Sequence, residues 1–156
     1  MFLEYGKRNK YTMIEKIIYK KRILAIIVKT KKVKKTGTNF VSPKNFTHQV
    51  GFINRPSGHV IKPHTHNKTL RKIFKTSEVL YVKNGVLRVD FYNNAKKYLS
   101  SRVLKSEDLI ILNEGSHGFK IIKKCKLIEI KQGPFFKSLD KIRFKKINEK
   151  KIKIKK

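Results

Sequence analysis

Three histidines and one glutamate are the residues of this chain whose types and spacing could do chemistry. His64 and His66 are separated by one residue, so on an extended strand both imidazoles lie on the same face. Glu78 follows twelve residues later, and His117 comes directly after the turn sequence NEGS. Imidazole and carboxylate groups together suit divalent transition metals. The sequence therefore predicts one mononuclear metal site formed by these four residues, with zinc, manganese, iron or nickel as candidate ions.

The elements that must position these residues are short apolar runs separated by turn residues. The runs read ILAIIV, HQVGFIN, HVIKPH, EVLYV, VLRVDFY, YLSSRVL, DLIIL, HGFKII and KLIEIKQ. Short, closely spaced strands of this kind are typical of an all-β sandwich or barrel. Only MIEKIIYKK, residues 13–21, would also fit a helix. We therefore expect an all-β fold.

The clearest turn signal is the sequence VKNGV. Asn-Gly between two alternating runs is typical of a two-residue hairpin loop, because a type I′ turn needs a positive φ at both central residues. The pattern predicts a hairpin with Asn84 and Gly85 as its loop and with Glu78 opposite Phe91. Alternation then places Glu78 on the apolar face. The opposite face is expected to be the wetter one, and it carries Tyr81, Lys83, Arg88 and Asp90.

A carboxylate on an apolar face needs a partner, because an unpaired buried charge is costly or becomes protonated. Two interpretations of Glu78 are open from the sequence. In the first, Glu78 lies at the mouth of its strand, where water or a lysine meets it. In the second, it is a metal ligand together with the three histidines, which alternation places on inward strand faces.

The chain of 156 residues is long enough for one domain with its own core. We expect an N-terminal extension over residues 1–21, the β domain over residues 22–146 and a lysine-rich tail over residues 147–156. Either Met1 or Met13 could start translation, since regular apolar patterning begins only after the second. The tail is expected to be solvated, or to add an edge strand through its KIKIK alternation.

The net charge of +30 comes from 33 lysines and 7 arginines against 10 acidic residues. The lysines are spread along the whole chain, whereas base readout favours arginine and asparagine clustered on one element. A genome rich in A and T would also produce this bias, together with the many Ile, Asn, Phe and Tyr residues. We therefore expect no specific nucleic-acid partner, only weak and salt-sensitive attraction to polyanions.

Cysteine usage and hydropathy exclude several classes of protein. The single cysteine, Cys125, excludes an internal disulfide framework and a cysteine-rich zinc site. No stretch approaches the roughly 20 apolar residues of a membrane helix, and no secretory signal pattern is present. We therefore expect a cytoplasmic protein with no membrane partner.

Two stretches resemble the motifs of the cupin superfamily. In the first, Gly58 precedes the His64-Thr65-His66 triplet, and Glu78 is followed by six residues and then Gly85. In the second, an acidic pair and the apolar run DLIIL lead through a glycine turn to His117. The sequences TSEVLYV, HGF and KQGPF are similar to those of small, stand-alone bacterial cupins.

The resemblance covers residues 46–132 and implies a single-domain cupin fold, a double-stranded β-helix that forms a jelly-roll barrel around a pocket. Membership of this superfamily does not fix a reaction. Our leading hypothesis is a metal-binding protein that acts on a small anionic molecule, a sugar or sugar phosphate, in an isomerase or epimerase type of reaction. No residue is assigned as the catalytic base. A non-enzymatic binding module, an iron-dependent oxygenase and a metal-free isomerase are the alternatives. Cupins often pair through edge strands, so a homodimer is a candidate assembly.

Candidate contacts for an anionic ligand surround the expected site. Residues 67–75 form a basic flap, which includes Arg71, between the HxH triplet and Glu78. Lys62 shares the strand face of His64, and Arg55 lies upstream. Gln132 ends the last clear strand, where it either lines the pocket or caps the strand end. The expected substrate-binding residues are Lys62, Arg55, Arg71 and Gln132.

Overall fold

The computed structural model describes residues 13–134, 136 and 140–155, and it is almost entirely β. The expectations for residues 1–12 fall outside the described residues. The strands are β1 (Ile14–Tyr19), β2 (Arg22–Lys29), β3 (Gly37–Phe40), β4 (Gly51–Asn54), β5 (Glu78–Tyr92), β6 (Tyr98–Lys105), β7 (Asp108–Leu112) and β8 (Ser116–Lys131). The all-β prediction is confirmed. Two single-turn 3₁₀ helices, Thr30–Lys32 and Glu149–Lys151, are the only helical elements among the described residues.

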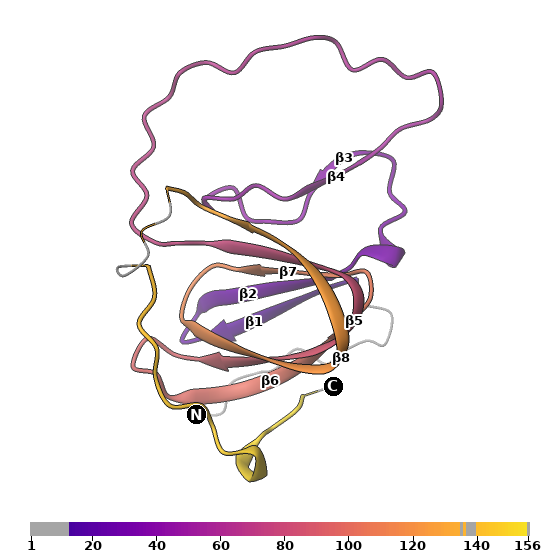
Figure 1. The fold of residues 1–156 in the computed structure, drawn as a ribbon. Helices are drawn as coiled ribbons and strands as arrows, with labels where there is room; N and C mark the ends of the chain where they lie inside the picture. The colour runs from indigo at the N-terminus through magenta and orange to yellow at the C-terminus, as the bar shows by residue number, and fades with distance from the viewer. Residues whose placement is uncertain (1–12, 135, 137–139, 156) are drawn as a thin grey trace.

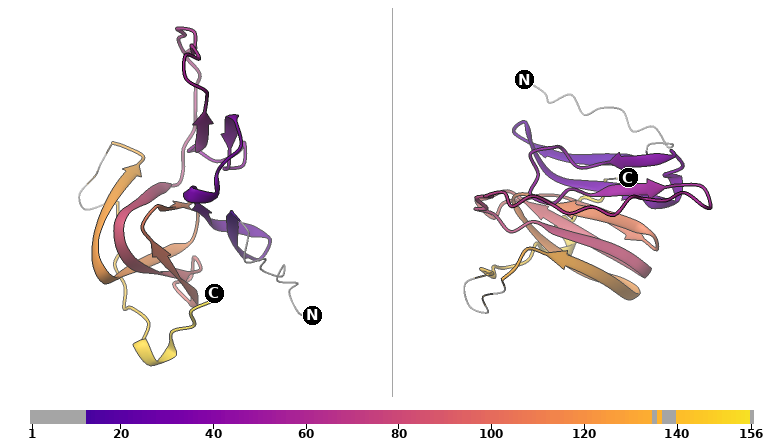
Figure 2. Two further views of the ribbon diagram at one scale, coloured as in Figure 1. Left: turned by 90° about the vertical axis from the view of Figure 1, so that its right-hand side faces the viewer. Right: turned by 90° about the horizontal axis from the view of Figure 1, so that it is seen from above.

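Six of the strands form one antiparallel sheet in the order β1-β2-β7-β5-β6, and β8 pairs with β5. β5 and β8 are long and curve together around the interior of the sheet (Figure 1). β3 and β4 form a separate two-stranded sheet that lies beside the large one (Figure 2). The described strands do not close into a barrel, so the fold is a curled sheet with a second small sheet against it.

The structure shows no hairpin at Asn84 and Gly85, and that prediction is wrong. β5 runs without interruption from Glu78 to Tyr92, and Glu78 is in register with Leu112 on one side and Lys131 on the other. A hairpin would require the two halves of β5 to pair with each other along one edge. In the observed sheet both edges are taken by other strands, because β8 follows the whole of β5 along one edge while β7 and β6 each pair with one half along the other.

The Asn-Gly sequence forms an irregularity in β5 instead of a loop. The register between β5 and β8 shifts repeatedly between Val82 and Leu87, and Gly85 has a φ of 95°. An extra residue in a strand reverses the alternation of side chains and bends the strand. The bend therefore keeps Val82 and Leu87 on the same face although five positions separate them. Both belong to the main core cluster.

The predicted grouping of apolar residues survives this change of topology. The main core lies on the inner face of the curled sheet and contains Leu80, Val82, Leu87, Val89 and Phe91, with β1, β2, β6 and β7 contributing the rest. A second core lies on the other face, where Val79 and Ile111 pack with Phe46 and with partly buried residues around β3 and β4. Burial of these apolar surfaces is the main force that holds the sheets together.

The face expected to be solvent-exposed is covered at Arg88 and Asp90, whereas Lys83 is exposed. Arg88 is 6% exposed and Asp90 is 5% exposed. Residues 140–155 run along this side of the sheet, and Ile154 forms a parallel bridge with Ser101 of β6 (Figure 1). The C-terminal segment thus contacts the β6 edge of the sheet through one bridge. This contact is in line with the interpretation that the tail adds to a sheet edge. Local alternation could not reveal this cover, because it depends on a segment about 60 residues further along the chain.

The boundary at residue 21 falls between two paired strands. β1 and β2 form an antiparallel pair in the large sheet, joined at Lys20 and Lys21, both of which have positive φ. Among the described residues no helix is long and apolar enough to span a membrane.

Candidate metal centre

Glu78 and His117 meet on the inner face of the curled sheet. The Nε2 atom of His117 lies 3.0 Å from Oε2 of Glu78. The Glu78 side chain is 8% exposed, and that of His117 is 27% exposed. The carboxylate that alternation placed on the apolar face is therefore buried there, and a histidine lies within hydrogen-bonding distance of it.

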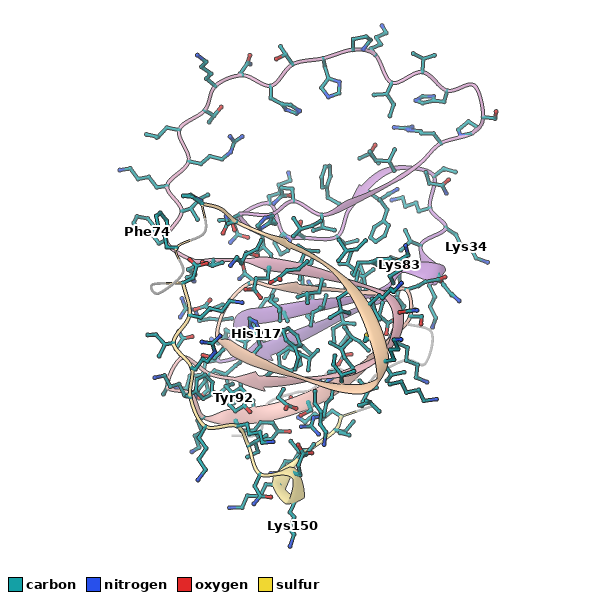
Figure 3. All side chains as sticks on the ribbon, in the orientation of Figure 1. Lys34, Phe74, Lys83, Tyr92, His117 and Lys150 are labelled. Atoms are coloured by element: carbon teal, nitrogen blue, oxygen red, sulfur yellow. The ribbon has the colours of Figure 1, made fainter. Side chains whose placement is uncertain are left out.

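This meeting depends on the curvature of β5. His117 is in register with Phe91, thirteen residues beyond Glu78 on β5. A straight strand of that length would separate the two positions by roughly 40 Å. The bend at Gly85 turns the two halves of β5 toward each other, so His117 reaches Glu78 across the interior of the sheet. Figure 3 labels His117 within this curve.

Hydrogen bonds hold the start of β5 in place. The Ser77 hydroxyl donates to the carbonyl oxygen of Leu112 at 3.0 Å, and the Ser77 amide donates to Oε1 of Gln132 at the same distance. Gln132 thus braces the chain next to Glu78 with its side chain. This contact agrees with the interpretation that Gln132 caps a strand end.

The surroundings of Glu78 favour its charged form. The hydrogen bond from His117 lowers the pKa of the Glu78 carboxyl below its ordinary value, against the opposing effect of burial. Lys141 and Lys131 add weaker attraction, and Nζ of Lys141 lies 3.9 Å from Oε1 of Glu78. Lys141 was not identified from the sequence, because nothing distinguishes it from the other lysines of the C-terminal region. The lysine of the first interpretation is therefore present beside Glu78, and so is one of the three histidines of the second.

His64 and His66 lie apart from this pair. They belong to residues 55–77, which connect β4 to β5 without forming a strand and arch away from both sheets (Figure 1). Both are exposed, and their ring centroids lie 5.3 Å apart. Within the described ranges, no group of three or more His, Cys, Asp or Glu residues is close enough to hold one ion. The structure thus joins two of the four expected ligands and holds the other two on a neighbouring connection.

The expected anion contacts are on the same connection. Lys62, Arg55 and Arg71 are all exposed. The carbonyl of Lys62 lies 3.0 Å from Nδ1 of His64, and Nη2 of Arg55 lies 3.4 Å from the Thr38 hydroxyl of β3. None of the three contacts the Glu78–His117 pair through an interaction described in the structure.

Comparison of the chain with protein-family models, with curated proteins and with solved structures finds no match. The protein is therefore described by its all-β architecture and by the carboxylate–imidazole pair of Glu78 and His117 inside the curled sheet. An activity can be proposed from these two features.

Proposed function

We propose that this chain is a cupin-like, metal-binding protein that acts on a small anionic molecule, a sugar or sugar phosphate, in an isomerase or epimerase type of reaction. The observation that carries the proposal is the Glu78–His117 pair on the inner face of the curled sheet, with Oε2 and Nε2 3.0 Å apart. A carboxylate buried on an apolar face needs a strong partner, and a metal ion shared with the imidazole would be one.

The donor types of these residues fit a divalent transition metal. Glu78 offers carboxylate oxygens and His117 offers an imidazole nitrogen. Glu78 projects from β5, which pairs with β7 and β8, and His117 projects from β8, which pairs with β5. His64 and His66 add two imidazoles whose rings are already neighbours. A set of three imidazoles and one carboxylate suits zinc, manganese, iron or nickel.

Closure of residues 55–77 over the sheet would bring all four ligands together. Among the described strands β8 pairs only with β5, so its other edge is free to accept a strand. On the inner face next to that edge, Phe119 is 41% exposed and Ile121 is 52% exposed. Residues 59–66 contain the exposed apolar side chains of Val60 and Ile61, which would gain cover by pairing there. In a strand formed by residues 59–66, alternation would direct the side chains of His64 and His66 to the same face of the sheet.

The bound metal would polarise a carbonyl or hydroxyl oxygen of the substrate. The chain itself would supply the charge complementarity. Lys62 would share a face with the two histidines once residues 59–66 pair as a strand, and Arg71 and Arg55 lie on the same connection. These side chains would hold the anionic end of the substrate, while the apolar inner face excludes water from the reacting end. Gln132 would keep Glu78 in position through Ser77.

Metal content tests the ligand assignment. We expect about one divalent ion per chain in protein purified without a histidine tag, and loss of that ion in the His64→Ala/His66→Ala variant with its β circular dichroism unchanged. The matched control is His48→Ala/His59→Ala, which removes two histidines outside the proposed ligand set and should keep the ion. Full metal content in the His64/His66 variant would contradict the proposal.

Calorimetry tests the substrate class. A sugar phosphate should bind more tightly than the corresponding neutral sugar, and the Lys62→Ala/Arg71→Ala variant should lose most of that preference, because both cations would face the phosphate. Equal affinities for the two sugars in both proteins would contradict an anionic substrate. The assignment of the four metal ligands would not be affected by this result, because metal content tests it separately.

A further inference from the structure

A hollow of about 470 Å³ opens at the end of the large sheet where β1 turns into β2. Four separate parts of the chain line it: the β1–β2 turn, residues 43–47, residues 72–75 and the turn at residues 113–114. Its volume lies within the range of small-molecule sites, roughly 300–1,000 Å³. It includes none of the four proposed metal ligands, so it is a second and separate site.

The hollow carries an excess of positive charge. Its basic side chains are Lys21, Arg22, Lys72 and Lys75, and Glu114 is its single carboxylate. Arg22 reaches one oxygen of Glu114 at 2.8 Å and Lys75 reaches the other at 3.1 Å. Lys21 and Lys72 form no ion pair with the described residues, so most of the positive charge is available for an external anion.

The polar floor of the hollow is fixed by backbone contacts. Glu114 is 9% exposed at its side chain, and its amide donates to the carbonyl of Leu24 at 3.1 Å. The amide of Asn113 donates to the same carbonyl at 2.9 Å, and its side-chain amide donates to the Ile23 carbonyl at 3.2 Å. These contacts join the 113–114 turn to β2. Glu114 can therefore hold Arg22 and Lys75 in place, with their remaining N–H groups free to face a ligand.

The other walls are apolar and include two aromatic rings. Ile23, Pro43 and Phe46 line one part of the hollow, and Phe74 lies between the two lysines of residues 72–75. Phe74 is 89% exposed, among the highest values of any large apolar residue described. Figure 3 shows it where residues 55–77 return to the sheet. An exposed ring flanked by cations is the arrangement on which nucleobases stack while lysines hold the phosphates.

We propose that this hollow binds a nucleotide, with its phosphates against Lys21, Lys72 and Arg22 and its base against Phe74. A polyphosphate supplies several negative charges to match the excess of cations. A base supplies a flat ring that can stack on the exposed ring of Phe74. A mononucleotide matches a hollow of this volume better than an oligonucleotide does, because a nucleic-acid strand needs a groove that continues along the surface.

The test is calorimetric titration of the full chain at physiological salt with adenosine triphosphate, inorganic tripolyphosphate and adenosine. Adenosine triphosphate should bind most tightly. The Lys21→Asn/Lys72→Ala variant should bind it about tenfold or more weakly, as expected for lost contacts to charged groups. Asparagine suits the left-handed backbone at position 21, where φ is 64°. The Phe74→Ala variant should lose about tenfold for adenosine triphosphate and nothing for tripolyphosphate.

Matched controls separate the hollow from the general charge of the chain. Lys123→Ala/Lys124→Ala removes two exposed lysines of β8, and Phe40→Ala removes an exposed ring of β3; neither should change affinity. Equal weakening by the two lysine variants would overturn the proposal in favour of diffuse charge. Tripolyphosphate binding as tightly as adenosine triphosphate would also overturn it. So would tighter binding of a thymidine dodecanucleotide that depends on Lys21 and Lys72, because the site would then belong to nucleic acid.

A folding control keeps the test decisive. If the double lysine variant loses its β circular dichroism, the single Lys72→Ala variant replaces it, since Lys72 is exposed and lies outside the strands. Metal content distinguishes this proposal from the proposed function. Protein that binds metal but no nucleotide contradicts only the nucleotide site, and protein that binds nucleotide but no metal contradicts only the metal site.

Discussion

Gly85 of β5 lies against the backbone of β8, and a Cβ added to it would meet the Lys124 carbonyl oxygen and lie 2.6 Å from Cα of Cys125. The φ of Gly85 is 95°, which L side chains rarely adopt. Close approach and backbone conformation together make glycine necessary at the bend on which the meeting of Glu78 and His117 depends.

Gly85→Ala should therefore destabilise the protein by about 3 kcal/mol or more, from backbone strain together with overpacking. Urea unfolding measures the change. Gly58→Ala is the matched control, because Gly58 also has a positive φ, 77°, but a Cβ there would meet nothing within 4 Å. The control should cost only about 1–2 kcal/mol, from the left-handed backbone conformation alone. Similar costs for the two variants would show that the contact with β8 is unimportant.

Arg88 and Asp90 form a buried pair on the other face of β5. Nε and Nη2 of Arg88 donate to the two oxygens of Asp90 at 2.8 and 3.0 Å, and the Ser101 hydroxyl donates to the same carboxylate. Removing one member leaves a buried charge without its partner, so Arg88→Met should cost about 3–5 kcal/mol.

The double variant Arg88→Met/Asp90→Leu should recover most of that loss, because it leaves no buried charge unpaired, and the half-exposed Glu149 keeps Lys120 as its partner. Thermal or urea unfolding of the wild type, both single variants and the double variant completes the cycle. Additive losses in the double variant would mean that the two residues act independently.

Glu149 connects the C-terminal segment to Arg88. Hydrogen bonds from Arg88 and Lys120 lower the pKa of the Glu149 carboxyl to about 2. The folded pKa is below the unfolded one, so the stabilisation is complete above the unfolded value of about 4.3 and is lost as pH falls through the folded value.

Wild type should therefore exceed Glu149→Gln in stability at neutral pH, and the difference should shrink between about pH 4 and pH 2. Denaturant unfolding at a series of pH values measures it. Glu129→Gln, an exposed change on β8, is the control and should remain near wild type throughout. A difference that grows as the pH falls would contradict the assignment of Glu149.

Closure of residues 55–77 predicts a change in hydrogen exchange on metal binding. The amides of residues 59–66 should exchange quickly in metal-free protein, since this segment is exposed and forms no strand. Addition of zinc or manganese should slow them through pairing with β8, and His64→Ala/His66→Ala should remove the effect. Protection confined to the neighbourhood of Glu78 and His117 would show that the ion binds without closure.

Attraction to nucleic acid should be nonspecific. The lysines of the chain are dispersed, so affinity for DNA should fall steeply with salt and should be the same for scrambled sequences. Filter binding or fluorescence anisotropy at two salt concentrations measures both properties. A preference for one sequence of more than about tenfold at physiological salt would contradict this expectation.

Local pattern in the sequence was enough to predict the all-β fold, the apolar grouping of Leu80, Val82, Leu87, Val89 and Phe91, and the placement of Glu78 on their face. These properties follow from the two-residue period of a strand, which neighbouring residues determine by themselves. The four-ligand metal site remains a prediction, because the structure brings together only Glu78 and His117.

Tertiary structure alone decided how the strands meet. Asn84 and Gly85 are suited to a tight turn, yet they form a bend in a continuous strand, because β8 pairs with both halves of β5. Arg88 and Asp90 are polar, yet they are buried, because Glu149 and the residues after it cover them. In both cases the competing interaction comes from a segment tens of residues away. The interactions with that distant segment contribute more to the free energy of folding than the local preference for a turn or for an exposed polar face. They cannot be read from the neighbouring residues alone.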